Sequence, residues 1–118
     1  MRILIAEDDE LILKTVEHKL VKEGFDVIIT RNGKDAIEQI KETEVDLIIT
    51  DIMMPFASGT EILSAVRSLG QKTPVIMLSS MGQEEVVLNA FDLGASDFMV
   101  KPFSPSELLL RIKRLTAK

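Results

Sequence analysis

The stretch ILIAEDDE at residues 3–10 decides the fold class of this chain. Its first four residues are apolar without alternation, which is typical of a short strand buried on both faces of a parallel sheet. Four acidic residues follow directly, so the strand is expected to end at residue 6 with carboxylates beside it. Ligands of open parallel sheets bind beyond the carboxyl ends of the strands. These acids are therefore the first candidate site residues.

The rest of the chain alternates between short apolar runs and segments with helical spacing. The further strands are predicted at residues 25–30, 46–50, 74–78 and 97–100. The helices are predicted at residues 10–23, 33–41, 60–69, 83–93 and from 104 to about 115, the last opening with a cap serine and a proline. Five alternations of strand and helix predict βαβ units, with helices on both faces of a parallel sheet.

Composition sets the class of protein. The chain has 118 residues, 46% hydrophobic and 28% charged, which predicts one globular domain over residues 1–118. The net charge of −5 argues against direct binding of nucleic acid. No apolar run approaches the ~20 residues of a membrane span, and residues 1–10 do not read as a signal peptide. We therefore expect a cytoplasmic protein with no membrane partner. The absence of cysteine excludes a thiol nucleophile and a cysteine-ligated metal.

Chemically useful side chains follow the other strands. Asp51 stands between two apolar segments, and Lys101 stands between Met99-Val100 and Pro102-Phe103, so each lies at the edge of a buried strand. Ser79 follows the fourth strand. If the first and third strands are neighbours, their acids converge, repel one another and favour a divalent cation, Mg²⁺ or Mn²⁺. Carboxylates, metal, lysine and hydroxyl together suit a site that holds a phosphoryl group.

Each residue alone also has a purely structural interpretation. Acids after a strand often cap the next helix, and Asp9 or Glu10 is expected to do so. Glu7 and Asp8 alone would be structural about as often as functional, and Ser79 alone would be an ordinary loop residue. His18 shares its helical stripe with lysines and is expected to be solvated.

Four motifs in order give the chain a family resemblance. They read ILIAED (residues 3–8), DLIITDIMMP (46–55), PVIMLS (74–79) and GASDFMVKPF (94–103). With them the chain resembles the receiver domain of two-component response regulators, from residue 3 to about residue 112. The resemblance implies a flavodoxin-like (βα)5 three-layer sandwich with a five-stranded parallel sheet in the order 2-1-3-4-5.

The resemblance also implies a phosphorylation site that depends on Mg²⁺, with Mn²⁺ as the alternative ion. Asp51 would be the phosphoacceptor. Asp8, Asp51 and the backbone carbonyl of Met53 would bind the metal, with Glu7 nearby or acting through water.

The remaining signature residues would stabilise and read the phosphoryl group. Lys101 would pair with it, and the bond from Lys101 to Pro102 is expected to be cis. Ser79 would donate a hydrogen bond to a phosphoryl oxygen, and Phe98 would be the aromatic switch residue. The output surface would be formed by the helix at 83–93, the strand at 97–100 and the last helix.

Such a domain is a phosphorylation-activated switch and not a turnover enzyme, although it catalyses its own phosphorylation and dephosphorylation. The implied donor is a sensor histidine kinase, a phosphotransfer protein or a small phosphodonor. The implied target of the output surface is an effector domain or partner protein, and the chain is expected to be a monomer or a phosphorylation-dependent homodimer.

Three other functions are weighed against this one. A haloacid-dehalogenase-type phosphatase needs a second acid two residues after its nucleophile, where this chain has Met53. A flavodoxin-type flavin module needs a Ser/Thr/Gly-rich loop after the first strand, where the acids at residues 7–10 would repel a phosphate. The third is a degenerate receiver that is never phosphorylated and acts as a protein docking module, against which the full set of site residues argues.

Some positions depart from the usual receiver pattern. Phe56 stands where glycine often follows the Met-Pro pair, and Ser80 stands where a small apolar residue is usual. Asp97 and Arg111 fit one charged pair that DNA-binding winged-helix regulators use when their receivers dimerise. The leucines at residues 108–110 cannot all share one helical stripe, so at least one is expected to be exposed.

Overall fold

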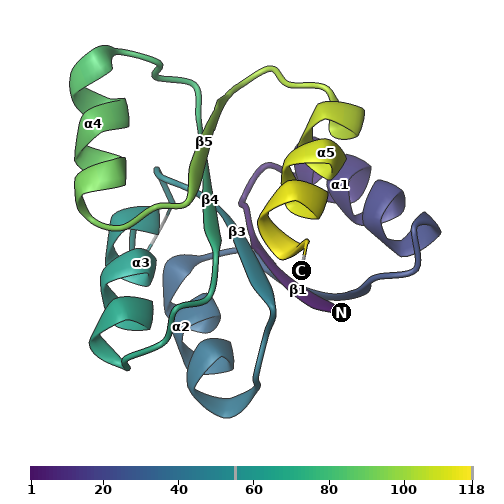
Figure 1. Ribbon diagram of the computed structural model, residues 1–118, viewed down its shortest axis with the longest axis horizontal. Coiled ribbons are helices and arrows are strands. Elements are labelled where there is room, and N and C mark those ends of the chain that lie inside the picture. The colour runs from purple at the N-terminus through teal and green to yellow at the C-terminus, as the bar shows by residue number, and fades with distance from the viewer. Residues whose placement is uncertain (55, 118) are drawn as a thin grey trace.

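The computed structural model describes residues 1–54 and 56–117, in which five strands alternate with five helices (Figure 1). Pro55 of the second motif and Lys118, the end of the predicted domain, lie outside the described residues. The strands are β1 (Arg2–Ala6), β2 (Asp26–Thr30), β3 (Leu47–Asp51), β4 (Val75–Ser79) and β5 (Asp97–Val100). The helices are α1 (Glu10–Lys22), α2 (Gly33–Glu42), α3 (Gly59–Ser68), α4 (Glu84–Asp92) and α5 (Pro105–Thr116).

The strands form one parallel sheet in the order β2-β1-β3-β4-β5, which confirms the predicted flavodoxin-like topology. Helices α1 and α5 cover one face of the sheet, and α2, α3 and α4 cover the other (Figure 1). The crossover from β2 to β3 passes over β1, so β1 and β3 are hydrogen-bonded neighbours although 40 residues lie between Ala6 and Leu47, the first residue of β3. The carboxyl ends of these two strands therefore lie side by side.

Burial on both faces explains why the strands lack polar alternation. In β1, Ile3 and Ile5 pack with the α1 and α5 side chains, whereas Leu4 and Ala6 pack with those of α2 and α3. Both sets are almost fully buried. A strand that supplies two cores needs apolar residues at every position.

The helix ends follow ordinary capping chemistry. Asp9 caps α1, because its Oδ1 accepts hydrogen bonds from the backbone N–H groups of Leu11 and Ile12 at 3.0 and 3.2 Å. Ser104 caps α5 with Pro105 in the first turn, as the sequence predicts. By contrast, Gln83 gives α4 no side-chain cap. Within residues 1–54 and 56–117, no helix has the length and apolar character needed to cross a membrane.

Two strands end one residue later than predicted. Asp51 pairs with Leu78, and Ser79 pairs with Val100, so β3 and β4 include the polar residues that were expected to follow them. The ladder continues because the backbone forms it regardless of side-chain polarity: Ile52 donates to the carbonyl of Leu78 at 3.0 Å. The carboxylate and the hydroxyl are consequently attached to rigid strand backbone and not to loops.

Two leucines of α5 offer a matched test of the packing. Leu108 is 1% exposed and lies in the core with α1, whereas Leu110 is 68% exposed. We expect Leu108→Ala to lower the free energy of unfolding by about 2–5 kcal/mol, through lost burial and a cavity. Leu110→Ala should change it by less than about 0.5 kcal/mol. Urea unfolding followed by circular dichroism measures both, and equal effects would contradict the packing of α5.

Candidate functional site

Three acidic side chains meet at the carboxyl ends of β1 and β3. Glu7 and Asp8 follow β1, and Asp51 ends β3; one carboxylate oxygen from each lies within 4.8 Å of the others. Glu7 and Asp51 are 1% and 7% exposed, while Asp8 is open to solvent. The parallel pairing of Ala6 with Thr50 sets this arrangement, since it brings the next residues of both strands to one edge. The convergence expected from the sequence is thus present in the structure.

Lys101, directly after β5, supplies a positive charge to this cluster. Its Nζ lies 2.8 Å from Glu7 Oε2 and 3.0 Å from Asp51 Oδ2, and its side chain is 14% exposed. The peptide bond from Lys101 to Pro102 is cis. One ammonium group pairs with two of the three carboxylates, so the cluster has an excess of negative charge.

Backbone N–H groups orient the two buried carboxylates. The Met53 N–H donates to Asp51 Oδ1 at 3.4 Å, and the Asp9 N–H donates to Glu7 Oε1 at 3.1 Å. Each carboxylate therefore has one oxygen toward a backbone donor and the other toward Lys101. This two-sided contact fixes the plane of each group before any ligand binds.

The charges of the buried groups influence one another. Burial raises the pKa of Glu7 above its usual value, and the charge of Asp51 adds to this, against the lowering effect of Lys101 and the Asp9 N–H. Burial would lower the pKa of Lys101, but its contacts with Glu7 and Asp51 outweigh that effect and raise the pKa. Lys101 is therefore a firmly protonated ammonium group at neutral pH.

The donor set of the cluster fits a hard divalent cation. All three side chains offer carboxylate oxygens, the ligands that Mg²⁺ prefers. Glu7 Oε2 is buried and lies 2.8 Å from the Lys101 ammonium, which it shares with Asp51. A bound cation would offset the negative charge that this one ammonium leaves unbalanced.

Ser79 and Phe98 lie on the neighbouring strands. Ser79 is buried at the end of β4, one residue beyond the residue that pairs with Asp51, and its Oγ accepts a hydrogen bond from the Met81 N–H at 3.0 Å. The hydroxyl hydrogen is not used in that bond and remains available to donate. Phe98 in β5 is buried in the core shared with α3 and α4. Ser80, in contrast, is exposed.

An apolar groove of about 450 Å³ borders Lys101 on the side of α1. Its walls are apolar side chains of α1 and of the segment after β5, including Leu11, Ile12, Val16, Pro102, Phe103 and Pro105. Sequence reasoning missed this groove, because only the sheet order places α1 beside α5. The sequence offered one signal, Leu11, an apolar residue outside the helical stripe of Ile12, Val16 and Leu20. In the structure its side chain is 77% exposed.

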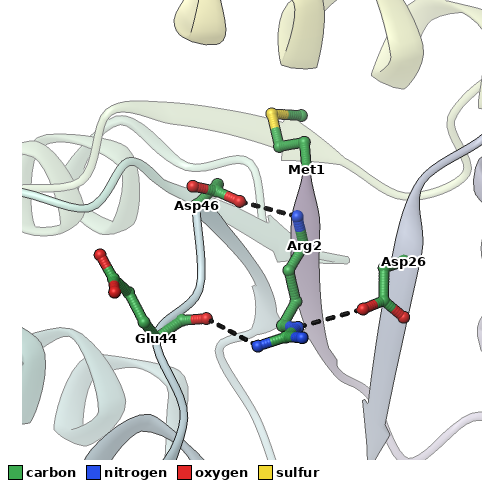
Figure 2. Close-up of a pocket in the computed structure, with 5 residues that line it drawn as sticks. All are labelled: Met1, Arg2, Asp26, Glu44 and Asp46. Atoms are coloured by element: carbon green, nitrogen blue, oxygen red, sulfur yellow. Dashed lines mark hydrogen bonds and ion pairs between the residues drawn. The ribbon is translucent and has the colours of Figure 1, made fainter.

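A second hollow lies at the opposite, amino-terminal edge of the sheet (Figure 2). There the Arg2 guanidinium pairs with Asp26 at 3.1 Å and donates to the Glu44 carbonyl, while the Arg2 backbone N–H donates to Asp46 (Figure 2). The Arg2 guanidinium is thus paired with Asp26, and none of the predicted site residues lines this hollow. The chemistry is concentrated at the carboxyl edge.

Known proteins resemble this chain over nearly its whole length. A family model described as the response regulator receiver domain matches residues 3–113. The transcriptional regulatory protein DltR of Streptococcus agalactiae is 39% identical over 116 residues, which cover 98% of this chain and 52% of that protein. The chemotaxis protein CheY of Bacillus subtilis is 38% identical, with 96% of this chain and 95% of that protein covered.

Solved structures agree with these sequence matches. The receiver domain of the Francisella response regulator 1452 has a TM-score of 0.92 and 33% identity, over 97% of this chain and 94% of that one. The chemotaxis response regulator CheY4 of Vibrio cholerae has a TM-score of 0.90 and 32% identity, over 97% of each chain. The chain spans about half the length of the DltR relative and nearly all of the CheY relative.

The excess negative charge predicts that the cluster destabilises the metal-free protein. In EDTA, Asp8→Asn should raise the melting temperature by about 2–8 °C, because it relieves repulsion with Glu7 and Asp51. Glu38→Gln, which removes the same charge from the exposed surface of α2, is the control and should have little effect. Differential scanning calorimetry measures the shift. A lower melting temperature for Asp8→Asn would show that Asp8 stabilises the free protein.

Proposed function

The chain belongs to the response regulator receiver domain family, and we propose that it is a switch turned on by Mg²⁺-dependent phosphorylation of Asp51. Receiver domains act as signalling switches and not as classical enzymes. One observation carries the proposal: the buried carboxylate of Asp51 is held 3.0 Å from the Lys101 ammonium, with Glu7 and Asp8 beside it. A nucleophile, a cation and further metal ligands thus converge at one point.

This geometry supports phosphoryl transfer to Asp51. An oxygen of Asp51 forms the new bond to phosphorus as the bond to the donor breaks, and the electron pair of that bond returns to the donor atom. Lys101 stays protonated and offsets the charge on the transferring group. Mg²⁺, held by Asp8, Asp51 and the carbonyl of Met53 with Glu7 nearby or through water, would supply the remaining charge neutralisation.

The phosphorylated site would then act on the neighbouring strand. The aspartyl phosphate adds roughly −1.5 to −2 charge and new acceptor oxygens. Ser79 would donate to one of them, because its Oγ accepts from the Met81 N–H and its hydroxyl hydrogen is not used in that bond. Movement of Ser79 would carry the segment after β4 with it and change the space around Phe98. The shift would favour one of two packings of α4 against the sheet.

The output surface that we propose is formed by α4, β5 and α5. It exposes the apolar side chains of Leu88, Phe91 and Leu110. In the free chain, Arg111 is bound within this surface to Asp97 at 2.7 Å. An effector domain, a partner protein or a second phosphorylated copy would contact it.

On the donor side, we propose a sensor histidine kinase or a phosphotransfer protein, with small phosphodonors as substitutes. The apolar groove beside Lys101 supports this choice. In this proposal, the donor histidine approaches Asp51 from the side of Lys101, and apolar neighbours of the histidine cover Leu11 and Phe103.

The phosphoacceptor assignment predicts a simple labelling result. With acetyl phosphate and Mg²⁺, the wild-type chain should gain one phosphoryl group by intact mass, and EDTA should abolish the gain. Asp51→Asn should not be labelled, because an amide is not a nucleophile here. Asp46→Asn alters an acid just before the amino end of the same strand and should be labelled like the wild type. Full labelling of Asp51→Asn would refute the proposal.

A second prediction separates phosphorylation from switching. Ser79→Ala should still be phosphorylated on Asp51, but phosphorylation should no longer change amide hydrogen exchange in residues 81–93. In the wild-type chain, and in Ser80→Ala as the exposed neighbouring control, acetyl phosphate should change that exchange. If Ser79→Ala responds as fully as the wild type, Ser79 does not transmit the signal.

A further inference from the structure

The β4–α4 segment (residues 80–83) rests against the last residue of β5. Gly82 lies in this segment, and a Cβ added to it would be 3.0 Å from Cγ2 and 3.5 Å from Cγ1 of Val100. The backbone of Gly82 therefore contacts the Val100 side chain and leaves no space for a further atom between them. Val100 is 46% exposed, so this contact covers part of a side chain that otherwise faces solvent.

Val100 is a direct neighbour of the residues proposed to carry the signal. It pairs with Ser79 in the sheet, and the Lys101 N–H donates to the Ser79 carbonyl at 2.8 Å. Alternate residues of a strand share a face, so the Val100 side chain lies on the same face as that of Phe98, which packs in the core with α3 and α4. The contact with Gly82 therefore lies beside the switch residues, on the face that α4 covers.

The sheet order sets the direction in which this contact responds. β4 lies between β3, which ends in Asp51, and β5, which ends in Val100 (Figure 1). A movement of Ser79 toward a phosphoryl group on Asp51 is therefore a movement toward β3 and away from β5. The Met81 N–H donates to the Ser79 Oγ at 3.0 Å, so the β4–α4 segment would follow Ser79. Gly82 would then move away from Val100.

Building on the proposed function, we propose that the contact between Gly82 and Val100 is a latch that stabilises the unphosphorylated position of the β4–α4 segment. The latch favours one state only, because the contact exists before Ser79 moves and is lost afterwards. An interaction that is present in one of two states shifts their populations toward that state. Val100 is thus a positioning residue, which acts through the segment and does not contact the phosphoryl group.

Removal of the two Val100 methyl groups should release the segment. In unphosphorylated Val100→Ala, amide hydrogen exchange of residues 81–93 should move toward the pattern of the wild-type chain labelled with acetyl phosphate. The switched state should be populated about three- to tenfold more than in the unphosphorylated wild type. Val100→Thr, which keeps two γ atoms, should retain the wild-type pattern. Val21→Ala makes the same substitution at a 55% exposed position of α1 and should also retain it.

Gly82→Ala tests the contact from the other side, because its effect should change sign with the residue at position 100. Alone, the added Cβ meets Val100 Cγ2 at 3.0 Å, displaces the segment and should favour the switched pattern. In Val100→Ala the γ atoms are gone, and the remaining Cβ lies 3.9 Å from the added one, at ordinary van der Waals distance. The double variant should therefore return toward the wild-type pattern. A general weakening of the segment would instead make the two effects add.

Intact mass after treatment with acetyl phosphate and Mg²⁺ separates the latch from the proposed function. Every variant of this set keeps Asp51 and should gain one phosphoryl group. A wild-type chain that is not labelled, or is labelled without any change in exchange, would refute the proposed function itself. If the wild type is labelled and responds, two results would refute the latch. One is a wild-type exchange pattern in Val100→Ala, and the other is a double variant that lies further from the wild type than either single variant.

Discussion

The contact of the Lys101 ammonium with Asp51 and Glu7 is the interaction on which the functional edge depends. Two carboxylates buried this deeply would be strongly disfavoured without a cation, since an isolated buried charge loses its hydration. Lys101 can supply that cation only because β5 ends at the same edge as β1 and β3. The sheet order therefore matters to the chemistry as much as to the packing. A different strand order would separate the lysine from the acids.

The same contact leaves the site incompletely neutralised, and this is what makes it chemically useful. A second cation beside Asp8 would offset the remaining negative charge, because Lys101 pairs with Glu7 and Asp51 and leaves the third carboxylate exposed to solvent. Strand pairing holds the backbone of Asp51, and the Met53 N–H and Lys101 hold its carboxylate beside the other acids. The repulsion between the carboxylates thus lowers the stability of the folded protein, and burial of the two apolar cores offsets this loss.

The sequence predicts the parts of the structure that local chemistry determines. Apolar runs without alternation predict the strands, and Asp9 and Ser104 predict where two helices begin. The four motifs predict the sheet order through the family resemblance. It misses features that depend on distant segments. The last residues of β3 and β4 were missed because the length of a strand depends on backbone pairing with its neighbour. The polarity of the side chains, which the sequence shows, does not determine where that pairing stops. The positive φ of Phe56 depends on the conformation of the loop between β3 and α3. The apolar groove beside Lys101 depends on the sheet order, which places α1 beside α5.

The helices are anchored unequally, and this difference gives the proposed switch its direction. α5 has a serine cap and buries Leu108, Leu109 and Ile112, whereas α4 lacks a side-chain cap and buries only Ala90. The carboxyl end of α4 is nevertheless fixed, because Arg67 donates to the Gly94 carbonyl and to two carbonyls before β4. The free end is the amino end, next to Met81, whose N–H binds Ser79. In the proposed switch, a movement of Ser79 would therefore displace the amino end of α4, which has fewer contacts. The helix would then tilt about its carboxyl end.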